Sequence, residues 1–237
     1  MTFKNSLILF IFLAGFLSCG IIKDTPKYQL SDGFYKSKIF QQPAKKVYAG
    51  NREDTVFIYH VNTKTKLPDT SVHLKINFPQ LLVNDNAKSH LLKQASFDID
   101  FLTIPFKYRP ALKDFPRQFN TNLNGVIYLG YRNDIYQFRY KQIPLKNFQR
   151  HTWHYGFSFG LFTGLGGTSM NPWVTNNQIV TEYDGVVWSK GVAGIIAINN
   201  FTIGLAVGFD DLLDNNKKYW IYQAKPWVGF AFGLNLN

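Results

Sequence analysis

Three stretches of the chain alternate large apolar residues with small ones at a period of two. In residues 201–210 every second side chain is large and apolar, and the residues between them are Thr, Gly, Ala or Asp. Residues 228–236 and 153–161 follow the same design. Successive side chains of a strand point to opposite faces, whereas a helix would mix the two sets. The alternation therefore predicts long β-strands with one large apolar face and one face of small residues.

The composition also favours an all-β fold. Aromatic residues make up 17% of the chain, and Glu, a strong helix former, occurs only at Glu53 and Glu182. Turn residues predict chain reversals at 132–134 and 199–200. The expected strands are 95–107, 118–131, 135–142, 152–165, 184–198, 201–210, 218–224 and 226–236. About eight antiparallel strands would close a small barrel.

The chain divides into regions of different character. Residues 19–94 contain short strand-like runs around a turn signal at 50–54 and are interrupted by prolines, which predicts a small basic β module or tether. Residues 95–237 form the expected barrel domain. Residues 1–150 carry 22 Lys and Arg against 10 Asp and Glu, whereas residues 151–237 carry 4 against 5. The basic residues are scattered, which is typical of a solvated surface, although such a surface also attracts anionic polymers and lipids.

Residues 1–18 predict a signal peptide. Lys4 precedes an apolar stretch, residues 6–17, that is short for crossing a bilayer, and polar sequence follows from Lys23. Cys19 ends this segment and is the only cysteine, so it has no disulfide partner in the chain. Cleavage after Gly20 and an uncleaved anchor are the two alternatives to processing at Cys19.

The tetrapeptide Phe16-Leu17-Ser18-Cys19 resembles the lipobox of bacterial lipoproteins. In that motif a small residue precedes a cysteine that is acylated on sulfur and becomes the mature N-terminus. Ser18 stands at the small position and Cys19 at the acylated one. The resemblance implies a lipid anchor, with palmitate as the acyl group, on Cys19.

In pattern, residues 95–237 resemble the small outer-membrane β-barrels of Gram-negative bacteria. A large apolar face opposite a small, weakly polar face suits a lipid-facing exterior around a tight interior, and strands of about 9–11 residues can span a bilayer. All five Trp lie in this region, several at the ends of runs, as an interfacial aromatic girdle requires. The resemblance implies a transmembrane-type barrel, and a soluble β domain tethered by lipid is the alternative.

We expect no catalytic, metal or cofactor site. His151 and His154 lack the spacing of a helical zinc pair and point to opposite faces of a strand. His154 and Ser158 do share a face, and Asp184 could approach them from a neighbouring strand, which leaves a lipid-modifying enzyme as an alternative.

Three other polar stretches have ordinary interpretations. Asp98 and Asp100 share a strand face and could bind a cation, yet such pairs are common in a barrel lumen. Residues 164–169 lack the lysine of a phosphate-binding loop and predict an inter-strand loop. Residues 210–216 lack the EF-hand spacing and predict a short turn at the rim.

Together these features predict a non-enzymatic outer-membrane or envelope-associated lipoprotein with a structural, adhesive or complex-accessory role. The alternatives are the lipid-modifying enzyme and a lipid-tethered β domain that binds a small ligand or glycan. The expected partners are outer-membrane lipid, an anionic envelope polysaccharide or another envelope protein. Because an exported protein is separated from cellular nucleic acid, we expect no nucleic-acid partner.

Overall fold

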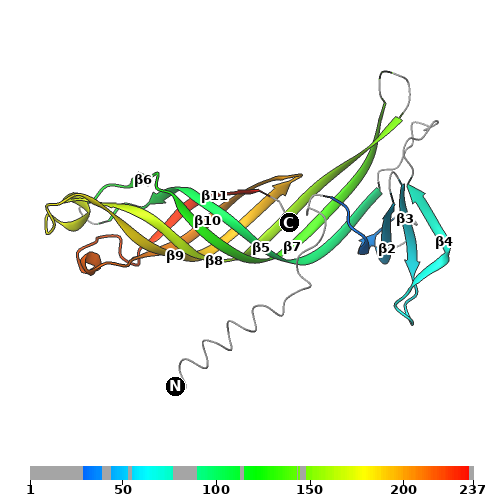
Figure 1. Ribbon diagram of the computed structural model, residues 1–237, viewed down its shortest axis with the longest axis horizontal. Helices are drawn as coiled ribbons and strands as arrows, with labels where there is room; N and C mark the ends of the chain where they lie inside the picture. The colour runs from blue at the N-terminus through cyan, green and yellow to red at the C-terminus, as the bar shows by residue number, and fades with distance from the viewer. Residues whose placement is uncertain are drawn as a thin grey trace.

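The computed structural model describes residues 29–38, 44–52, 55–76, 90–112, 115–142, 144 and 148–234. This part of the chain is all-β, and strands joined by turns form one antiparallel sheet with two short 3-10 helices (Figure 1). The elements are β1 (Gly33–Ser37), β2 (Lys45–Arg52), β3 (Thr55–Val61), β4 (Pro68–Ile76), β5 (His90–Arg109), β6 (Gln118–Asn120), β7 (Asn124–Gln142), β8 (Phe148–Met170), η1 (Trp173–Thr175), β9 (Tyr183–Ile198), β10 (Phe201–Leu212), η2 (Asn215–Lys218) and β11 (Pro226–Leu234). Cys19 and the expected signal segment lie outside the described residues.

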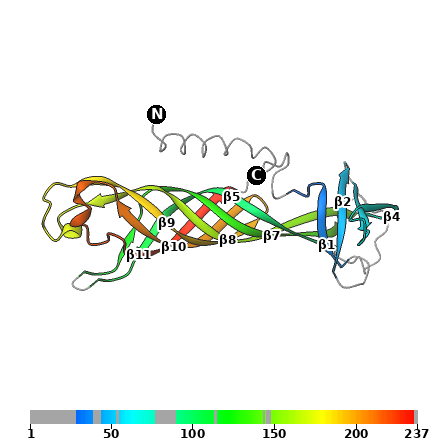
Figure 2. The same ribbon diagram turned by 90° about the horizontal axis from the view of Figure 1, so that it is seen from below.

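Six strands pair in a ring. The order β5-β7-β8-β9-β10-β11 is closed by pairing of β11 with β5, which shifts register between Phe230 and Phe232. The ring is uneven, because its strands range from nine residues in β11 to 23 in β8. The ends of β5 and β7 extend beyond it, and β1 to β4 continue the sheet from β5 at one end of the elongated molecule (Figure 2).

The ring contains six strands instead of the eight expected because one predicted turn and one predicted strand are absent. Residues 132–134 were expected to turn, but they lie within β7, which pairs continuously with β5 on one side and β8 on the other. Residues 164–169, expected to be a loop, belong to β8 and pair with β9. Residues 218–224, expected to be a strand, hold the end of η2 and a series of turns.

Other local predictions are confirmed. Residues 201–210 form most of β10, and residues 226–234 form β11. Asn199 and Asn200 connect β9 to β10, with Asn199 at a φ of 51°. Asn tolerates this left-handed conformation, which a tight hairpin requires. Asp210 lies in β10, whereas Asp214 accepts a hydrogen bond from the Asn216 amide at the start of η2, so only the second part of the predicted rim turn is a turn.

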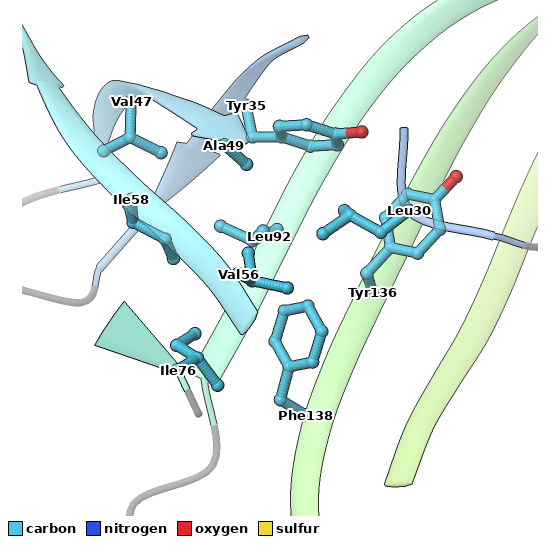
Figure 3. Packing of buried hydrophobic residues seen from close by; sticks show 10 residues of the cluster. All are labelled: Leu30, Tyr35, Val47, Ala49, Val56, Ile58, Ile76, Leu92, Tyr136 and Phe138. Carbon is cyan, nitrogen blue, oxygen red and sulfur yellow. The ribbon is translucent and has the colours of Figure 1, made fainter. Parts of the chain in front are cut away.

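The strands β1 to β4 pack on the extended ends of β5 and β7. The sheet order continues β5-β1-β2-β3-β4 through antiparallel pairs. Their core consists of Leu30, Tyr35, Val47, Ala49, Val56, Ile58, Ile76, Leu92, Tyr136 and Phe138 (Figure 3). We call these four strands and this core the end module. Since Leu92 comes from β5 and Tyr136 and Phe138 from β7, the long strands belong both to the end module's core and to the ring.

The interior of the ring has a separate apolar core. It consists of Leu102, Ile104, Val126, Tyr128, Phe162, Ala193, Ile195, Ala206, Trp227 and Ala231. A third cluster at the end opposite the end module contains Met170, Val174, Val187, Leu212, Trp220 and Tyr222. Large side chains at Phe162 and Trp227 are accommodated by Gly191 and Gly208, where a Cβ would lie within 3 Å of the Phe162 ring. The ring is therefore packed with side chains.

Candidate functional site

The outer surface of the ring is apolar. On β10, Phe201, Leu205 and Phe209 are 51%, 57% and 43% exposed, whereas the intervening Thr202 and Asp210 are buried. The same alternation occurs on β8, where Phe159 is 67% exposed beside the buried Ser158. Further exposed apolar side chains on the ring are Phe97, Ile99, Phe101, Ile127, Leu129, Tyr131, Phe157, Leu161, Leu165, Val186, Val192, Ile196, Ile198, Ile203, Val207, Val228 and Phe230. This band is far larger than the isolated apolar patches of ordinary water-soluble surfaces.

The five Trp are divided between surface and interior. Trp153, Trp173 and Trp188 are exposed, and the Trp188 indole donates a hydrogen bond to Thr163 Oγ1 at 2.8 Å. Trp220 and Trp227 are buried. The sequence-based prediction that tryptophans mark a surface girdle therefore applies to at most three of them.

A first cluster of charges lies inside the ring around Asp210 of β10, and its other members come from three further strands. Lys107 Nζ on β5 donates to Asp210 Oδ1 at 2.9 Å, to Asn124 Oδ1 on β7 at 2.8 Å and to Ser189 Oγ on β9 at 3.0 Å. Arg109, also on β5, pairs with the second oxygen of the carboxylate. We call these five residues the Asp210 cluster. Their side chains are almost fully buried.

Aromatic rings complete the surroundings of the two cations. Lys107 Nζ lies 4.4 Å from the Trp227 ring centroid, and the Arg109 guanidinium lies over the rings of Trp220 and Tyr222, at 5.2 and 5.0 Å. A cation over an aromatic face is attracted by the ring quadrupole, more strongly when water is excluded. The cluster thus neutralises a buried carboxylate with two cations and spreads the remaining charge over aromatic faces.

A second cluster lies nearer the end module, around Asp134 on β7. Asp134 Oδ1 is 2.8 Å from Arg132 Nε and 2.7 Å from His154 Nε2 on β8. Arg132 Nη1 also lies 3.7 Å from Asp98 Oδ1 on β5. A side chain at position 156 would displace the Arg132 guanidinium, because a Cβ at Gly156 would come within 2.6 Å of Nη2. We call these charged residues and His154 the Asp134 cluster.

The enzyme-like arrangement considered from the sequence is not assembled. Ser158 Oγ is 2.8 Å from the Tyr128 hydroxyl, and His154 Nε2 is bonded to Asp134. Asp184 accepts a hydrogen bond from the exposed Ser169 at 3.2 Å. The three candidate residues therefore have three different partners, and the structure does not bring them together as nucleophile, base and orienting acid.

Asp98 and Asp100, the pair considered as a cation site, lie beside a positively charged side chain of the protein. Asp98 and Asp100 are buried on β5, as expected of inward-facing residues, and Arg132 supplies a positive charge beside Asp98. His151 is exposed and points away from His154. Within the described ranges, no group of three or more His, Cys, Asp or Glu is arranged to hold a metal ion.

Sequence reasoning placed Asp98, Asp100 and Asp210 on inward faces but missed four interior charges, namely Lys107, Arg109, Arg132 and Asp134. It predicted an interior of small, weakly polar residues, which holds for much of β10 and β11 but not for β5 and β7. A signal was present: Lys107 and Arg109 alternate with Phe106 and Tyr108, and period two places them opposite the apolar face. This alternation was overlooked because the Lys and Arg residues of the first 150 positions were interpreted as a solvated basic surface.

A polar cavity of about 350 Å³ lies at the end of the ring opposite the end module. It is lined by Gln118, Phe119, Asn120, Thr121, Asn122, Thr168, Ser169, Asn171, Val174, Trp220 and Tyr222. Amide and hydroxyl groups beside an indole could hold a small polar ligand.

Comparison with protein-family models, with curated proteins and with solved structures finds no match to this chain. In the described part of the chain, no helix has the length and apolar character needed to cross a membrane.

Proposed function

We propose that this chain is an exported lipoprotein of the bacterial outer membrane, whose six-stranded ring is a small transmembrane β-barrel with a structural, adhesive or complex-accessory role. The observation that carries the proposal is the inverted distribution of side chains. Large apolar residues cover the outside, while the charges of the Asp210 and Asp134 clusters lie inside. Hydrocarbon favours this arrangement, whereas water would penalise it by about 25 cal/mol for each Å² of exposed apolar surface.

Backbone pairing supports the same proposal. A lipid-exposed strand edge leaves amide and carbonyl groups without partners, at a cost of several kcal/mol each, so membrane-spanning sheets close on themselves. Pairing of β11 with β5 supplies such a closure. The exposed apolar side chains of β8 extend from Trp153 to Leu165, a run of 13 residues, and a tilted strand needs about 9–11 residues to span a bilayer.

The filled interior favours a structural role over transport. The apolar ring core lies between the Asp210 and Asp134 clusters, and each cluster pairs its charges internally. A conducting pore of the porin type instead requires a wide, water-filled lumen. The ring would thus hold the end module at the membrane surface, and acylation of Cys19 would add a second attachment of the same chain to the membrane.

Two measurements on the full chain test membrane insertion and anchoring. Folded barrels migrate differently from boiled ones on a detergent gel, and metabolic palmitate labelling of wild type and Cys19→Ser reports the acyl group. We expect a heat-dependent shift in both proteins and a label only in wild type. Release of Cys19→Ser into the soluble fraction as a folded protein would show that the ring is a water-soluble domain and would overturn the barrel.

A matched pair of variants tests the apolar band directly. Phe159 on the ring and Leu67 in the β3–β4 turn are 67% and 65% exposed. Phe159→Arg places a charge in the hydrocarbon region, at a cost of about 2–4 kcal/mol near the bilayer midplane. Leu67→Arg places the same charge in water. We expect the first variant to lose insertion and the second to retain it, and equal insertion of both would contradict the proposal.

A further inference from the structure

The end module has an exposed face on the side of its sheet opposite its core. Side chains of β1 to β4 alternate between the core and this outer face. The outer face carries a row of rings across the four strands, which we call the aromatic row. It consists of Phe34, Tyr48, Tyr59, Phe57 and His73. Phe34 is 39% exposed, His73 is exposed, and the other rings are half-buried against one another.

The rings contact one another from strand to strand. Phe34 on β1 packs edge-on against Tyr48 on β2 with centroids 5.3 Å apart, and Tyr48 lies 6.4 Å from Tyr59 on β3. Phe57 and His73 continue the row, at 5.7 Å from each other. Such pairs hold side chains in fixed orientations, so the row presents a preformed apolar surface rather than independent mobile rings.

A row of lysines runs beside the rings, formed by Lys46 on β2, Lys36 on β1 and Lys93 on β5. Lys36 pairs in register with Lys46 on one side and with Lys93 on the other, so three ammonium groups stand on directly opposed positions of adjacent strands. All three are exposed, and none forms an ion pair with an acid in the described part of the chain. Like charges at opposed positions destabilise a sheet.

Lysine side chains contact the rings of the aromatic row. Lys46 Nζ lies 4.3 Å from the Phe34 ring centroid, and Lys75 Nζ on β4 lies 5.6 Å from that of Phe57. Cations therefore border the aromatic row at both ends. The nearby acid Asp32 accepts a hydrogen bond from the Asn51 amide at 2.6 Å, at the edge of this face.

We propose that this face of the end module binds an anionic polysaccharide. Aromatic rings stack on the apolar faces of sugar rings, and the lysine row neutralises carboxylate or phosphate groups repeated along the polymer. Binding would also remove the repulsion that the three opposed lysines cause in the free protein. The inference goes beyond the proposed membrane role and does not require the ring to be a barrel, since the face belongs to β1–β5 outside the ring.

The test uses the full chain in uncharged detergent micelles and oligogalacturonate, a sugar chain with one carboxylate per residue, as the probe. We expect saturable binding that weakens as salt rises. Lys36→Gln/Lys93→Gln should weaken it roughly fivefold to tenfold, from two exposed charge contacts. Tyr48→Thr, which keeps a strand-forming residue, should weaken it roughly threefold to tenfold through lost stacking.

The control is Lys217→Gln/Lys218→Gln, which removes the same charge from η2 at the far end of the molecule. We expect its affinity to stay within about twofold of wild type. An equal loss in this control, or no binding of oligogalacturonate by wild type, would overturn the inference.

Other probes exclude other ligands. Polyglutamate carries the same charge without sugar rings, and its binding should be weaker and unaffected by Tyr48→Thr. Equal or tighter binding of oligothymidylate, or of phosphatidylcholine vesicles containing phosphatidylglycerol, would replace the polysaccharide by a nucleic acid or by a lipid surface. Heat-dependent gel migration of each variant shows whether its ring is folded, independently of glycan binding. Failure of glycan binding and failure of membrane insertion are therefore distinguishable.

Discussion

At the residue scale, the interior of the ring is specified by a few buried charges whose partners come from distant parts of the sequence. Asp210 is close to three donors, from Lys107, Arg109 and Ser189, two of them about 100 positions away. Desolvating a carboxylate costs several kcal/mol, and only close opposite charges and hydrogen bonds offset this cost. Removing one partner therefore lowers the free energy of unfolding more than replacing the whole pair by apolar residues would.

Asp210→Asn should destabilise the ring strongly. The amide leaves Lys107 and Arg109 buried without a counter-charge, and breaking such a pair costs about 3–5 kcal/mol. The neighbouring substitution Asp211→Asn is the control, because Asp211 pairs with Lys190 at a partly exposed site where the two side chains are 22% and 43% exposed. It should cost at most about 1 kcal/mol. Urea unfolding in detergent checks both values, and similar costs would show that burial is not the deciding factor.

Tyr35 makes the end module sensitive to alkaline pH. Burial raises the pKa of Tyr35 from its ordinary value of 10.0 to about 12, although its hydroxyl donates a hydrogen bond to the Ser31 carbonyl at 2.7 Å. The folded state therefore keeps the proton that the unfolded state releases. The resulting stability is complete below pH 10 and is lost as the pH rises from 10 towards 12. Tyr35→Phe should unfold over this range with a smaller pH dependence than wild type, as followed by circular dichroism. An identical dependence would contradict the assignment.

At the element scale, the sequence predicted strands more reliably than it predicted their ends. The alternation was correctly interpreted in residues 201–210 of β10 and 228–233 of β11, because there the inward residues are small or polar and the outward residues are large. Residues 132–134 were interpreted as a turn because Asn and Asp favour turns in isolation. In the structure Arg132 and Asp134 point inward and pair with each other, so tertiary partners outweigh local preference.

The glycines of β8 give an element-scale prediction with a control in the same strand. A Cβ at Gly164 would lie 2.1 Å from the Gly125 carbonyl oxygen of β7, a backbone atom that cannot move without breaking the pairing. A Cβ at Gly167 would meet no atom within 4 Å. Gly164→Ala should therefore cost roughly 1–3 kcal/mol or prevent closure, and Gly167→Ala should be nearly neutral. The fraction showing heat-dependent gel migration measures both, and equal behaviour would refute the close approach of β7 and β8.

At the scale of the whole molecule, the sequence predicted a closed barrel of about eight strands, whereas the structure has an uneven ring of six strands. The sequence indicated an all-β chain with a smaller N-terminal region, but closure depends on pairing of β5 with β11, which lie more than 100 residues apart. The long strands were also unforeseen. β5 runs through residues 94 and 95, where a boundary between module and barrel was expected, and contributes Leu92 to one core and Leu102 to the other. One strand thus takes part in two separately packed units.

This arrangement predicts that the two units can be weakened independently. Phe138 and Phe162 are both buried, the first in the end-module core and the second in the ring core. Truncation of a buried Phe to Ala costs about 3–5 kcal/mol through lost burial and the cavity left behind. Phe138→Ala should expose the end module to proteolysis, beginning at the exposed β3–β4 turn, while the ring keeps its heat-dependent migration. Phe162→Ala should lower the temperature of that shift and leave the end module resistant until the ring opens. If either substitution disrupts both units to the same extent, β5 and β7 transmit instability along their whole length, and the molecule unfolds as a single cooperative unit.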